Sequence, residues 1–274
     1  MNNKLRDKVF FVTGASTGIG EAIAREAASS GAHVMLLARR ADRLERVAQD
    51  INAHGGSASH AVCDVTQEDQ LAAAVEKTRA TFGGIDVVIA NAGFGVQGTL
   101  SDLTIDDYRR QFECNVFGVL TTLYATLGSL KERRGCIGIM GSVNGYLNVP
   151  GWSAYCMSKH AVRSLCACVR HELLPEGVSV THLAPGFIES DFRRVSNDNV
   201  LREEAKDPVP PWLVMPAPKA AKQMINAVVR RRAEAVITMH GKAAVELERH
   251  APSLVSGVVG LSGAWVRRLS KNAG

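Results

Sequence analysis

Short apolar runs alternate with helical patterns along most of this chain, and this alternation limits the folds open to it more than any other feature. Seven runs predict strands: 8–13, 33–38, 57–63, 85–90, 136–140, 178–183 and 235–239. The segments between and after them predict helices: 21–30, 41–53, 67–82, 104–131, 153–174, 219–232 and 242–250. Strands that alternate with helices in this way form parallel sheets that are covered on both faces. The sequence therefore predicts an α/β fold with a doubly wound, mostly parallel sheet of about seven strands in a single domain, 1–274.

Glycines and polar side chains follow the predicted strands at their carboxyl ends. The segments in question are Gly14-Ala15-Ser16-Thr17-Gly18-Ile19-Gly20, Asp64-Val65, Asn91-Ala92-Gly93, Gly141-Ser142 and Ala184-Pro185-Gly186. The carboxyl ends of parallel strands lie at one edge of the sheet, where ligands of such folds bind. We therefore expect these positions to converge on one crevice.

The first of these segments joins a strand to a helix through three glycines. This arrangement places a helix N-terminus and free backbone N–H groups where a phosphate can bind. The spacing is G-x-x-x-G-x-G and differs from the common dinucleotide fingerprint G-x-G-x-x-G. A glycine turn between strand and helix also occurs in proteins that bind no nucleotide, so this loop alone leaves both interpretations open.

Arg39 and Arg40 follow the second strand, where an enzyme selective for NAD would carry an acidic residue. Ala38 occupies the acidic position, and an arginine there can pair with the 2′-phosphate of NADP(H). This pattern favours NADP(H) as cofactor. The alternative is that both arginines are exposed residues at a helix entry.

Tyr155 and Lys159 lie four residues apart in the helix predicted over 153–174. This spacing places both side chains on one helix face, with their Cβ atoms roughly 5–6 Å apart. A cation beside a tyrosine favours the phenolate and can bring its pKa toward the working range. The pair can therefore act as an acid and base toward an alcohol or carbonyl, although the same spacing is also common in surface helices.

The composition limits the partners and the compartment. The net charge of +5 is modest, and the basic residues occur mainly as scattered pairs, so no nucleic-acid partner is expected. Six cysteines without a CxxC pair are typical of a reducing compartment. The chain enters its first strand without a signal peptide, and no run reaches the ~18–20 apolar residues of a membrane span. These features predict a cytoplasmic protein.

Two segments depart from the alternation of strands and helices. Residues 187–218 contain five prolines and the apolar run 212–215, and we interpret them as an insertion that covers the crevice and contacts the substrate. Residues 241–274 form a variable tail with an apolar part over 254–269. The tail packs on the domain or on a partner subunit, or it contacts a membrane surface; the sequence favours packing.

Taken in order, these residues resemble the short-chain dehydrogenase/reductase family, in its compact single-domain branch. The resemblance covers residues 7–240 and rests on seven motifs in register. They are Thr13-Gly14-x-x-x-Gly18-x-Gly20, Asp64, Asn91-Ala92-Gly93, Asn115, Ser142, Tyr155-x-x-x-Lys159 and Pro185-Gly186. The glycine spacing is the form typical of this branch, so the resemblance implies a Rossmann-type fold.

The resemblance implies a catalytic role for four residues. Tyr155 would be the general acid in carbonyl reduction and the base in alcohol oxidation, and Lys159 would hold the nicotinamide ribose and lower the pKa of Tyr155. Ser142 would bind the reacting oxygen by a hydrogen bond. Asn115 would hold a water molecule in a proton relay.

The resemblance also implies positions around the cofactor and the substrate. The residues expected at the cofactor are Gly14, Ser16, Thr17, Gly18, Ile19, Gly20, Arg39, Arg40, Asp64, Val65, Asn91, Ala92, Gly93, Tyr155, Lys159, Pro185, Gly186, Ile188 and Ser190. Those expected at the substrate are Ser142, Asn144, Trp152, Tyr155 and Phe187. The histidines show no metal-ligand spacing, and no metal site is expected. Oligomers of the family usually pair two helices, which here are those over 104–131 and 153–174, so the resemblance implies a homodimer or homotetramer.

The function that follows is an NADP(H)-dependent oxidoreductase that transfers a hydride between the nicotinamide and a secondary alcohol or carbonyl. The apolar run 212–215 indicates an apolar small-molecule substrate that is lipid-, steroid- or retinoid-like. The alternative is a nucleotide-binding or scaffold protein that keeps the fold without catalysis. Because such a protein would be expected to have lost one of the four residues, we favour the enzyme.

Overall fold

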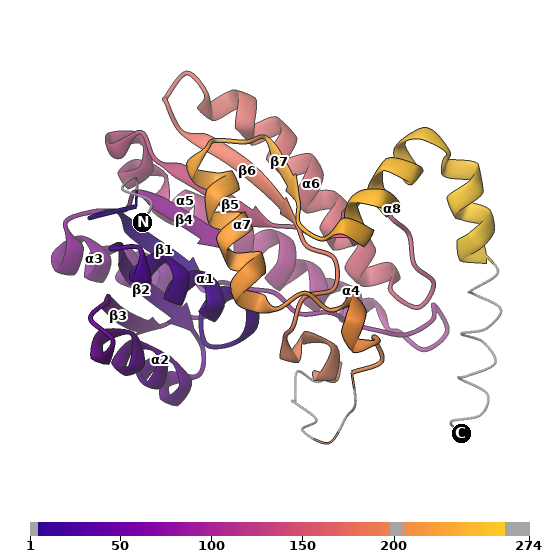
Figure 1. Ribbon diagram of the computed structural model, residues 1–274, viewed down its shortest axis with the longest axis horizontal. Helices are drawn as coiled ribbons and strands as arrows, with labels where there is room; N and C mark the ends of the chain where they lie inside the picture. Colours follow the sequence, from indigo (N-terminus) through magenta and orange to yellow (C-terminus); the bar gives the residue numbers. More distant parts are fainter. Residues whose placement is uncertain (1–4, 198–203, 205–206, 261–274) are drawn as a thin grey trace.

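The computed structural model describes residues 5–197, 204 and 207–260, and its centre is a seven-stranded sheet (Figure 1). The strands are β1 (Val9–Thr13), β2 (His33–Ala38), β3 (Ser57–Val62), β4 (Val87–Ala90), β5 (Cys136–Met140), β6 (Ser179–Ala184) and β7 (Glu234–Val236). Their order in space is β3-β2-β1-β4-β5-β6-β7, and every neighbouring pair is parallel. The predicted doubly wound Rossmann-type sheet is confirmed.

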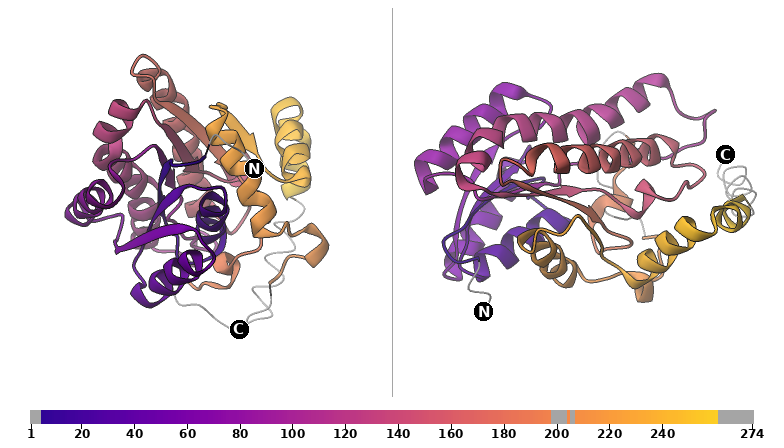
Figure 2. Two further views of the ribbon diagram at one scale, coloured as in Figure 1. Left: turned by 60° about the vertical axis from the view of Figure 1, so that its left-hand side comes forward. Right: turned by 90° about the horizontal axis from the view of Figure 1, so that it is seen from above.

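Helices cover both faces of the sheet, as Figure 2 shows. One apolar core joins the sheet to α1 (Gly18–Ser29), α2 (Ala41–Ala53) and α7 (Ala217–Val229). A second core joins it to α3 (Glu68–Phe82), α5 (Gly118–Arg133) and α6 (Ser153–Leu173). Strands β1, β4, β5 and β6 are buried along their whole length because apolar side chains face a helix layer on each side.

The order of the strands fixes where a ligand can bind. β1 pairs with β2 on one side and with β4 on the other, so the connections that follow β1 and β4 leave in opposite directions. A crevice opens outside the carboxyl ends of the strands at such a switch point. The glycine loop after β1 and the Asn91-Ala92-Gly93 segment after β4 lie on its two sides.

The helix predicted over 104–131 is interrupted. It consists of α4 (Ile105–Phe112), a π-helical turn η1 (Glu113–Phe117) and α5. Thr104 begins α4 with a capping box, in which its side chain accepts from Asp107 N–H and the Asp107 carboxylate accepts from Thr104 N–H. Single π turns inside α-helices are often found at functional sites, and this one contains Asn115.

The last predicted strand, 235–239, is wrong at its carboxyl end. β7 ends at Val236, and α8 (Met239–His250) begins three residues earlier than expected. The Thr238 hydroxyl accepts a hydrogen bond from Gly241 N–H at 3.2 Å and caps the new helix. A threonine at the N-cap favours this start of the helix over a longer strand.

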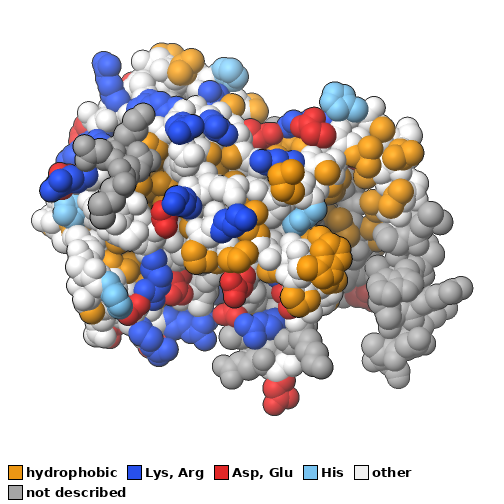
Figure 3. Space-filling model, viewed as in Figure 1, with side chains coloured by type: hydrophobic (Ala, Val, Ile, Leu, Met, Phe, Trp, Pro, Cys, Tyr) orange, Lys and Arg blue, Asp and Glu red, His pale blue; other side chains and the backbone are white. Residues whose placement is uncertain are grey.

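The last described residues, 252–260, project from the body of the molecule (Figures 1 and 2). The sequence predicted the last helix only to residue 250, and residues 252–260 are also helical. Leu254 and Val258 are 59% and 62% exposed, so these residues do not pack on the domain. On the face shown in Figure 3, exposed hydrophobic side chains are concentrated in the half that includes α8. The part of the predicted apolar tail beyond residue 260 lies outside the described residues.

No helix among the described residues combines the length and the hydropathy that a membrane span requires.

Candidate functional site

A cavity of about 1040 Å³ lies at the carboxyl ends of the strands. Its walls come from the loops after β1, β2, β3, β4, β5 and β6 and from the segment after Pro185. The residues predicted at the cofactor or substrate that line it are Gly14, Ser16, Thr17, Gly18, Ile19, Arg39, Arg40, Asp64, Val65, Asn91, Ala92, Gly93, Ser142, Asn144, Trp152, Tyr155, Lys159, Pro185, Gly186, Phe187, Ile188 and Ser190. Gly20 and Asn115 are the two predicted positions that do not line it.

The glycine loop fits the phosphates of a dinucleotide. Gly14 and Gly18 adopt φ values of +64° and +60°, a conformation that glycine tolerates best. Thr17 is the N-cap of α1 but makes no side-chain cap, so the side chain leaves the first N–H groups of the helix to a ligand. Gly20 acts differently: a Cβ there would lie 2.3 Å from the Gly14 carbonyl oxygen, so this glycine lets the loop pack closely.

Asn91 fastens the glycine loop to β4. Its side-chain amide donates to the carbonyl oxygens of Thr13 and Gly14, at 2.9 and 3.2 Å. The Thr13 hydroxyl in turn accepts from the backbone N–H groups of Asn91 and Ala92, at 2.9 and 3.0 Å. These bonds hold the two sides of the switch point at a fixed separation. Asn91 therefore positions the loop in addition to lining the cavity.

Two arginines stand at the end of the cavity formed by the loops after β2 and β3. The Arg40 guanidinium donates to the hydroxyls of Ser16 and Thr17, each at 3.2 Å. Arg39 lies 3.8 Å from the Asp64 carboxylate, and its side chain is 59% exposed. Arg40 therefore extends the polar surface of the glycine loop, and Arg39 lies beside the segment that follows β3.

Tyr155, Ser142 and Lys159 meet in the middle of the cavity. Tyr155 is 8% exposed and shares a hydrogen bond with Ser142. The Lys159 ammonium donates to the Met140 carbonyl oxygen at 2.7 Å and lies 5.7 Å from the centroid of the Tyr155 ring. The spacing of four residues on α6 thus places the ammonium and the phenol on one helix face.

Burial dominates the ionisation of this group. It raises the pKa of Tyr155 to about 12, while the hydrogen bond with Ser142 acts in the opposite direction. It lowers the pKa of Lys159 to about 8. Desolvation of the phenolate thus outweighs the contact that favours it, and the effect of Lys159 on the pKa of Tyr155 stays a prediction. A neutral Tyr155 can donate a proton to a carbonyl oxygen.

Asn115 lies behind the wall of the cavity, in the π turn. Its side chain is fully buried, accepts from Phe94 N–H at 3.1 Å and donates to the Phe94 carbonyl oxygen at 2.9 Å. It also donates to the Ser158 hydroxyl at 3.3 Å. Asn115 therefore fixes the loop after β4 against α6.

A family model for short chain dehydrogenases matches residues 8–201. The chain belongs to the short-chain dehydrogenase family.

Two relatives of this short-chain dehydrogenase illustrate its sequence neighbourhood. It is 34% identical over 205 residues to an uncharacterized oxidoreductase of Staphylococcus saprophyticus, and the aligned part covers 74% of this chain and 82% of the relative. It is 33% identical over 193 residues to mouse dehydrogenase/reductase SDR family member 7B, and the aligned part covers 69% of this chain and 60% of the relative. The chain thus spans less than two thirds of the mouse protein.

Two solved structures share the fold of this short-chain dehydrogenase. A short-chain dehydrogenase/reductase from Burkholderia phymatum in complex with NAD superposes with a TM-score of 0.81 and 25% identity, over 92% of this chain and 96% of the other. An alcohol dehydrogenase from the archaeon Thermococcus sibiricus complexed with 5-hydroxy-NADP superposes with a TM-score of 0.73 and 29% identity, over 84% and 96%.

In this short-chain dehydrogenase, the segment after Ser190 contributes residues to the cavity that the sequence interpretation missed. Phe192, from the short 3₁₀ helix η3 (Asp191–Arg194), lies with its ring centroid 5.3 Å from that of Tyr155. Val195 and Val209 from the same insertion also line the cavity. The apolar run 212–215 does not line it, and Trp212 is 81% exposed. The sequence feature that could have indicated Phe192 is its position, because it is an aromatic residue two positions after Ser190, which was expected at the cofactor.

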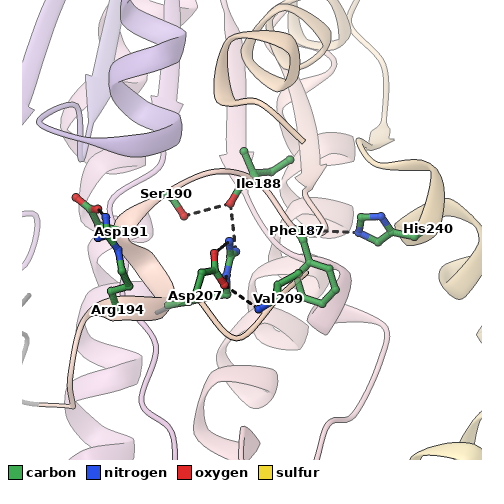
Figure 4. A network of polar contacts seen from close by, with 9 residues as sticks. Phe187, Ile188, Ser190, Asp191, Arg194, Asp207, Val209 and His240 are labelled. Carbon is green, nitrogen blue, oxygen red and sulfur yellow. Dashed lines mark hydrogen bonds and ion pairs between the residues drawn. The ribbon is translucent and has the colours of Figure 1, made fainter. Parts of the chain in front are cut away.

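Polar contacts tie the insertion of this short-chain dehydrogenase to the body, as Figure 4 shows for part of the network. The Phe187 N–H donates to His240 Nε2 at 3.2 Å, and the two rings stack with centroids 5.2 Å apart. Arg193 pairs with Asp207, whose carboxylate also accepts from Val209 N–H at 3.0 Å. The two arms of the insertion are thereby joined to each other and to α8.

A buried histidine lies directly behind Ser142. His182 on β6 is 3% exposed; its Nδ1 lies 3.2 Å from the Tyr146 hydroxyl, and its Nε2 has no hydrogen-bond partner among the described residues. Burial lowers the pKa of His182 to about 4, so the ring is neutral at pH 7. A Cβ at Gly141 would lie 2.0 Å from that Nε2. Gly141 is therefore the residue that allows the imidazole to stand beside the loop that carries Ser142.

Proposed function

We propose that this chain is an NADP(H)-dependent oxidoreductase that transfers a hydride between the nicotinamide and a secondary alcohol or carbonyl compound. The observation that carries the proposal is the meeting of Tyr155, Ser142 and Lys159 with the glycine loop in one cavity. As proposed, the nicotinamide supplies or accepts the hydride when it is bound. The chain supplies the position, the charge and the proton.

Ser142, Tyr155 and Lys159 would each have a separate role in the reaction. Ser142 and Tyr155 donate hydrogen bonds to the carbonyl oxygen and place the carbonyl carbon for hydride addition. As the carbon gains the hydride, the Tyr155 hydroxyl gives its proton to the oxygen, and the product is the alcohol. In the oxidative direction the deprotonated Tyr155 takes the hydroxyl proton. The Lys159 ammonium stabilises the negative charge that Tyr155 carries after it has donated.

The cofactor site would use the glycine loop for the phosphates, with Pro185, Gly186, Ile188 and Ser190 beside the nicotinamide. Among the structural neighbours one holds NAD and another a derivative of NADP, so the preference for NADP(H) depends on Arg39 and Arg40. The contacts of Arg40 with Ser16 and Thr17 support a site for a 2′-phosphate, because they gather donors next to the adenosine end.

Replacing Arg40 or Arg39 with alanine tests this preference. We expect each change to weaken NADPH binding about 10- to 100-fold, because a hydrogen-bonded charge contributes about 1.5–3 kcal/mol. NADH binding should change little. Protein fluorescence titrations with both cofactors measure the effect, and Arg46→Ala, an exposed arginine of α2 outside the cavity, is the control. Equal affinity of the wild type for NADH and NADPH would contradict the proposal.

We further propose a single domain with a cytoplasmic location, in which residues 187–218 cover the substrate. The contacts between Arg193 and Asp207 and between Phe187 and His240 support the covering role, since they join described parts of this segment to each other and to α8. The described part of the C-terminal tail offers Leu254 and Val258 for a contact outside the domain, and we favour a partner subunit over a membrane surface.

A homodimer or homotetramer is the proposed assembly. Phe117, Tyr124 and Met157 are apolar or aromatic, lie on η1, α5 and α6, and are 51%, 77% and 51% exposed. Burying such side chains favours association. We expect sedimentation at micromolar concentration to give two or four times the 29.4 kDa of the chain, and Tyr124→Asp to lower that mass. A monomeric wild type would contradict this assembly.

A further inference from the structure

Three aromatic rings surround the position where a substrate would meet Tyr155. Trp152, one turn before Tyr155, lies with its ring centroid 5.8 Å from that of Tyr155 and with the ring planes at 69°. The Phe192 ring lies 5.3 Å from Tyr155 and 6.4 Å from Trp152. Trp152 and Phe192 are within 15° of parallel, so a flat ring laid against one of them is also parallel to the other. We call these two rings the aromatic wall.

Gly95 makes this arrangement of rings possible. A Cβ at this position would lie 2.7 Å from Phe192 Cζ and 3.0 Å from Trp152 Cζ3. Contacts that short do not occur in proteins without movement of a neighbour, so any other residue at 95 would displace a ring of the wall. The three positions come from the loop after β4, the start of α6 and the insertion, and they are complementary only in the folded chain.

Three arginines that line the cavity are paired with carboxylates. Arg109 pairs with Asp106 at 2.8 Å, and Arg110 with Asp107 at 3.0 Å. Arg193 pairs with Asp207, and its guanidinium lies over the Phe187 ring. Each of these three arginines therefore already has a carboxylate partner. Because each guanidinium already faces a carboxylate, a carboxylate or phosphate on the substrate would meet a largely neutralised surface, which favours an uncharged substrate.

We propose that the aromatic wall selects a flat, uncharged aromatic ring, and that the preferred substrates are aryl ketones or aldehydes and the corresponding aryl alcohols. This inference rests on the proposed function and names its substrate class. In an aryl ketone, conjugation keeps the carbonyl group in the plane of the ring. A substrate face that packs on either of these parallel rings therefore also sets the direction of the carbonyl toward Tyr155 and Ser142, whereas a saturated ring leaves that bond free to rotate.

The reaction balances with the groups already named. The carbonyl carbon gains a hydride from NADPH, the carbonyl oxygen gains the proton of the Tyr155 hydroxyl, and solvent returns a proton to Tyr155. The products are the aryl alcohol and NADP⁺. Aromatic packing on the wall adds a few-fold to about tenfold preference over a saturated ring of the same size.

The test compares acetophenone with cyclohexyl methyl ketone, which differ mainly in whether the ring is flat. We expect the ratio of their kcat/KM values to fall about 5- to 10-fold in Phe192→Leu, because leucine keeps the apolar contact but not the flat face. Trp212→Leu, a change of an exposed aromatic in the same insertion, should leave the ratio unchanged. Because the two ketones differ in intrinsic reactivity, the change of the ratio between variants is the quantity that decides. An equal ratio in the wild type and Phe192→Leu overturns the inference.

A binding experiment separates this inference from the proposed function. Tyr155→Phe with NADPH bound is titrated with both ketones by calorimetry, and tighter binding of acetophenone, lost in the double variant with Phe192→Leu, is the expected result. Equal binding of the two ketones overturns the aromatic wall even where the wild type reduces ketones. Selective binding without reduction of any ketone by the wild type would leave the wall in place and contradict the proposed reaction.

Discussion

Replacing Tyr155 with phenylalanine is expected to lower kcat/KM for carbonyl reduction about 10²- to 10⁴-fold, the usual contribution of general acid–base catalysis. The substitution removes the hydroxyl that we propose delivers the proton to the reacting oxygen, and it keeps the aromatic ring that packs against Trp152 and Phe192. Because the phenol is buried, its replacement by a phenyl ring of nearly the same shape should not weaken the fold. Steady-state kinetics with NADPH and a ketone measure the loss.

The accompanying controls show that the hydroxyl, and not the fold, is responsible. NADPH binding to Tyr155→Phe, followed by nicotinamide fluorescence, should stay within a few-fold of the wild type. Tyr108→Phe is the matched variant: this hydroxyl bonds to Ser153 at the start of α6 and does not line the cavity, so activity should change little. Substantial turnover by Tyr155→Phe would show that another group donates the proton.

Gly141→Ala is expected to destabilise the protein by about 1–3 kcal/mol and to lower kcat/KM about 100-fold. The new methyl group would lie 2.0 Å from Nε2 of His182, whose ring is buried between β5 and Tyr146. Either the imidazole or the loop must move. Since Ser142 is the next residue in the chain, a shift of the loop moves the hydroxyl that we propose binds the reacting oxygen. Denaturant unfolding and kinetics measure the two effects.

A double variant identifies the cause of that loss. His182→Val removes the clashing imidazole, so Gly141→Ala should cost much less in this background than in the wild type. Gly128→Ala is the control: a Cβ at this helical position meets nothing within 4 Å, so the change should leave kcat/KM unchanged and should raise the stability slightly and not lower it. Equal losses from Gly141→Ala in the two backgrounds would show that His182 is not what excludes the methyl group.

His182 illustrates a site feature that no pattern in the sequence reveals. Its chain neighbours are those of a buried strand, and the imidazole could equally have been a satisfied core residue. Only the pairing of β5 with β6 brings it against Gly141, with Leu183 opposite Met140 and Ile139 opposite His182. Contacts across a sheet depend on strand order and register, which local patterns do not specify.

The apolar run 212–215 shows how composition can mislead. Its hydrophobicity suggested a lining of the substrate pocket, yet Trp212 is exposed and Phe192 takes that position. Both residues belong to the same insertion and are equally apolar. What distinguishes them is the path of a loop fixed by Arg193, Asp207 and His240. A path of this kind is set by distant partners, so the sequence pattern could not predict it.

The sequence by itself determined the sheet, the glycine loop, and the pairing of Tyr155 with Lys159. Each of these depends on local spacing: the alternation of strands and helices, glycines that tolerate positive φ, and residues four apart on one helix face. Three features depend on the tertiary structure alone. Burial raises the pKa of Tyr155, and Asn115 supports Phe94 from behind the cavity. Arg40 reaches the glycine loop. Desolvation and contacts between distant segments arise only when the chain is packed, and they are therefore absent from any local pattern.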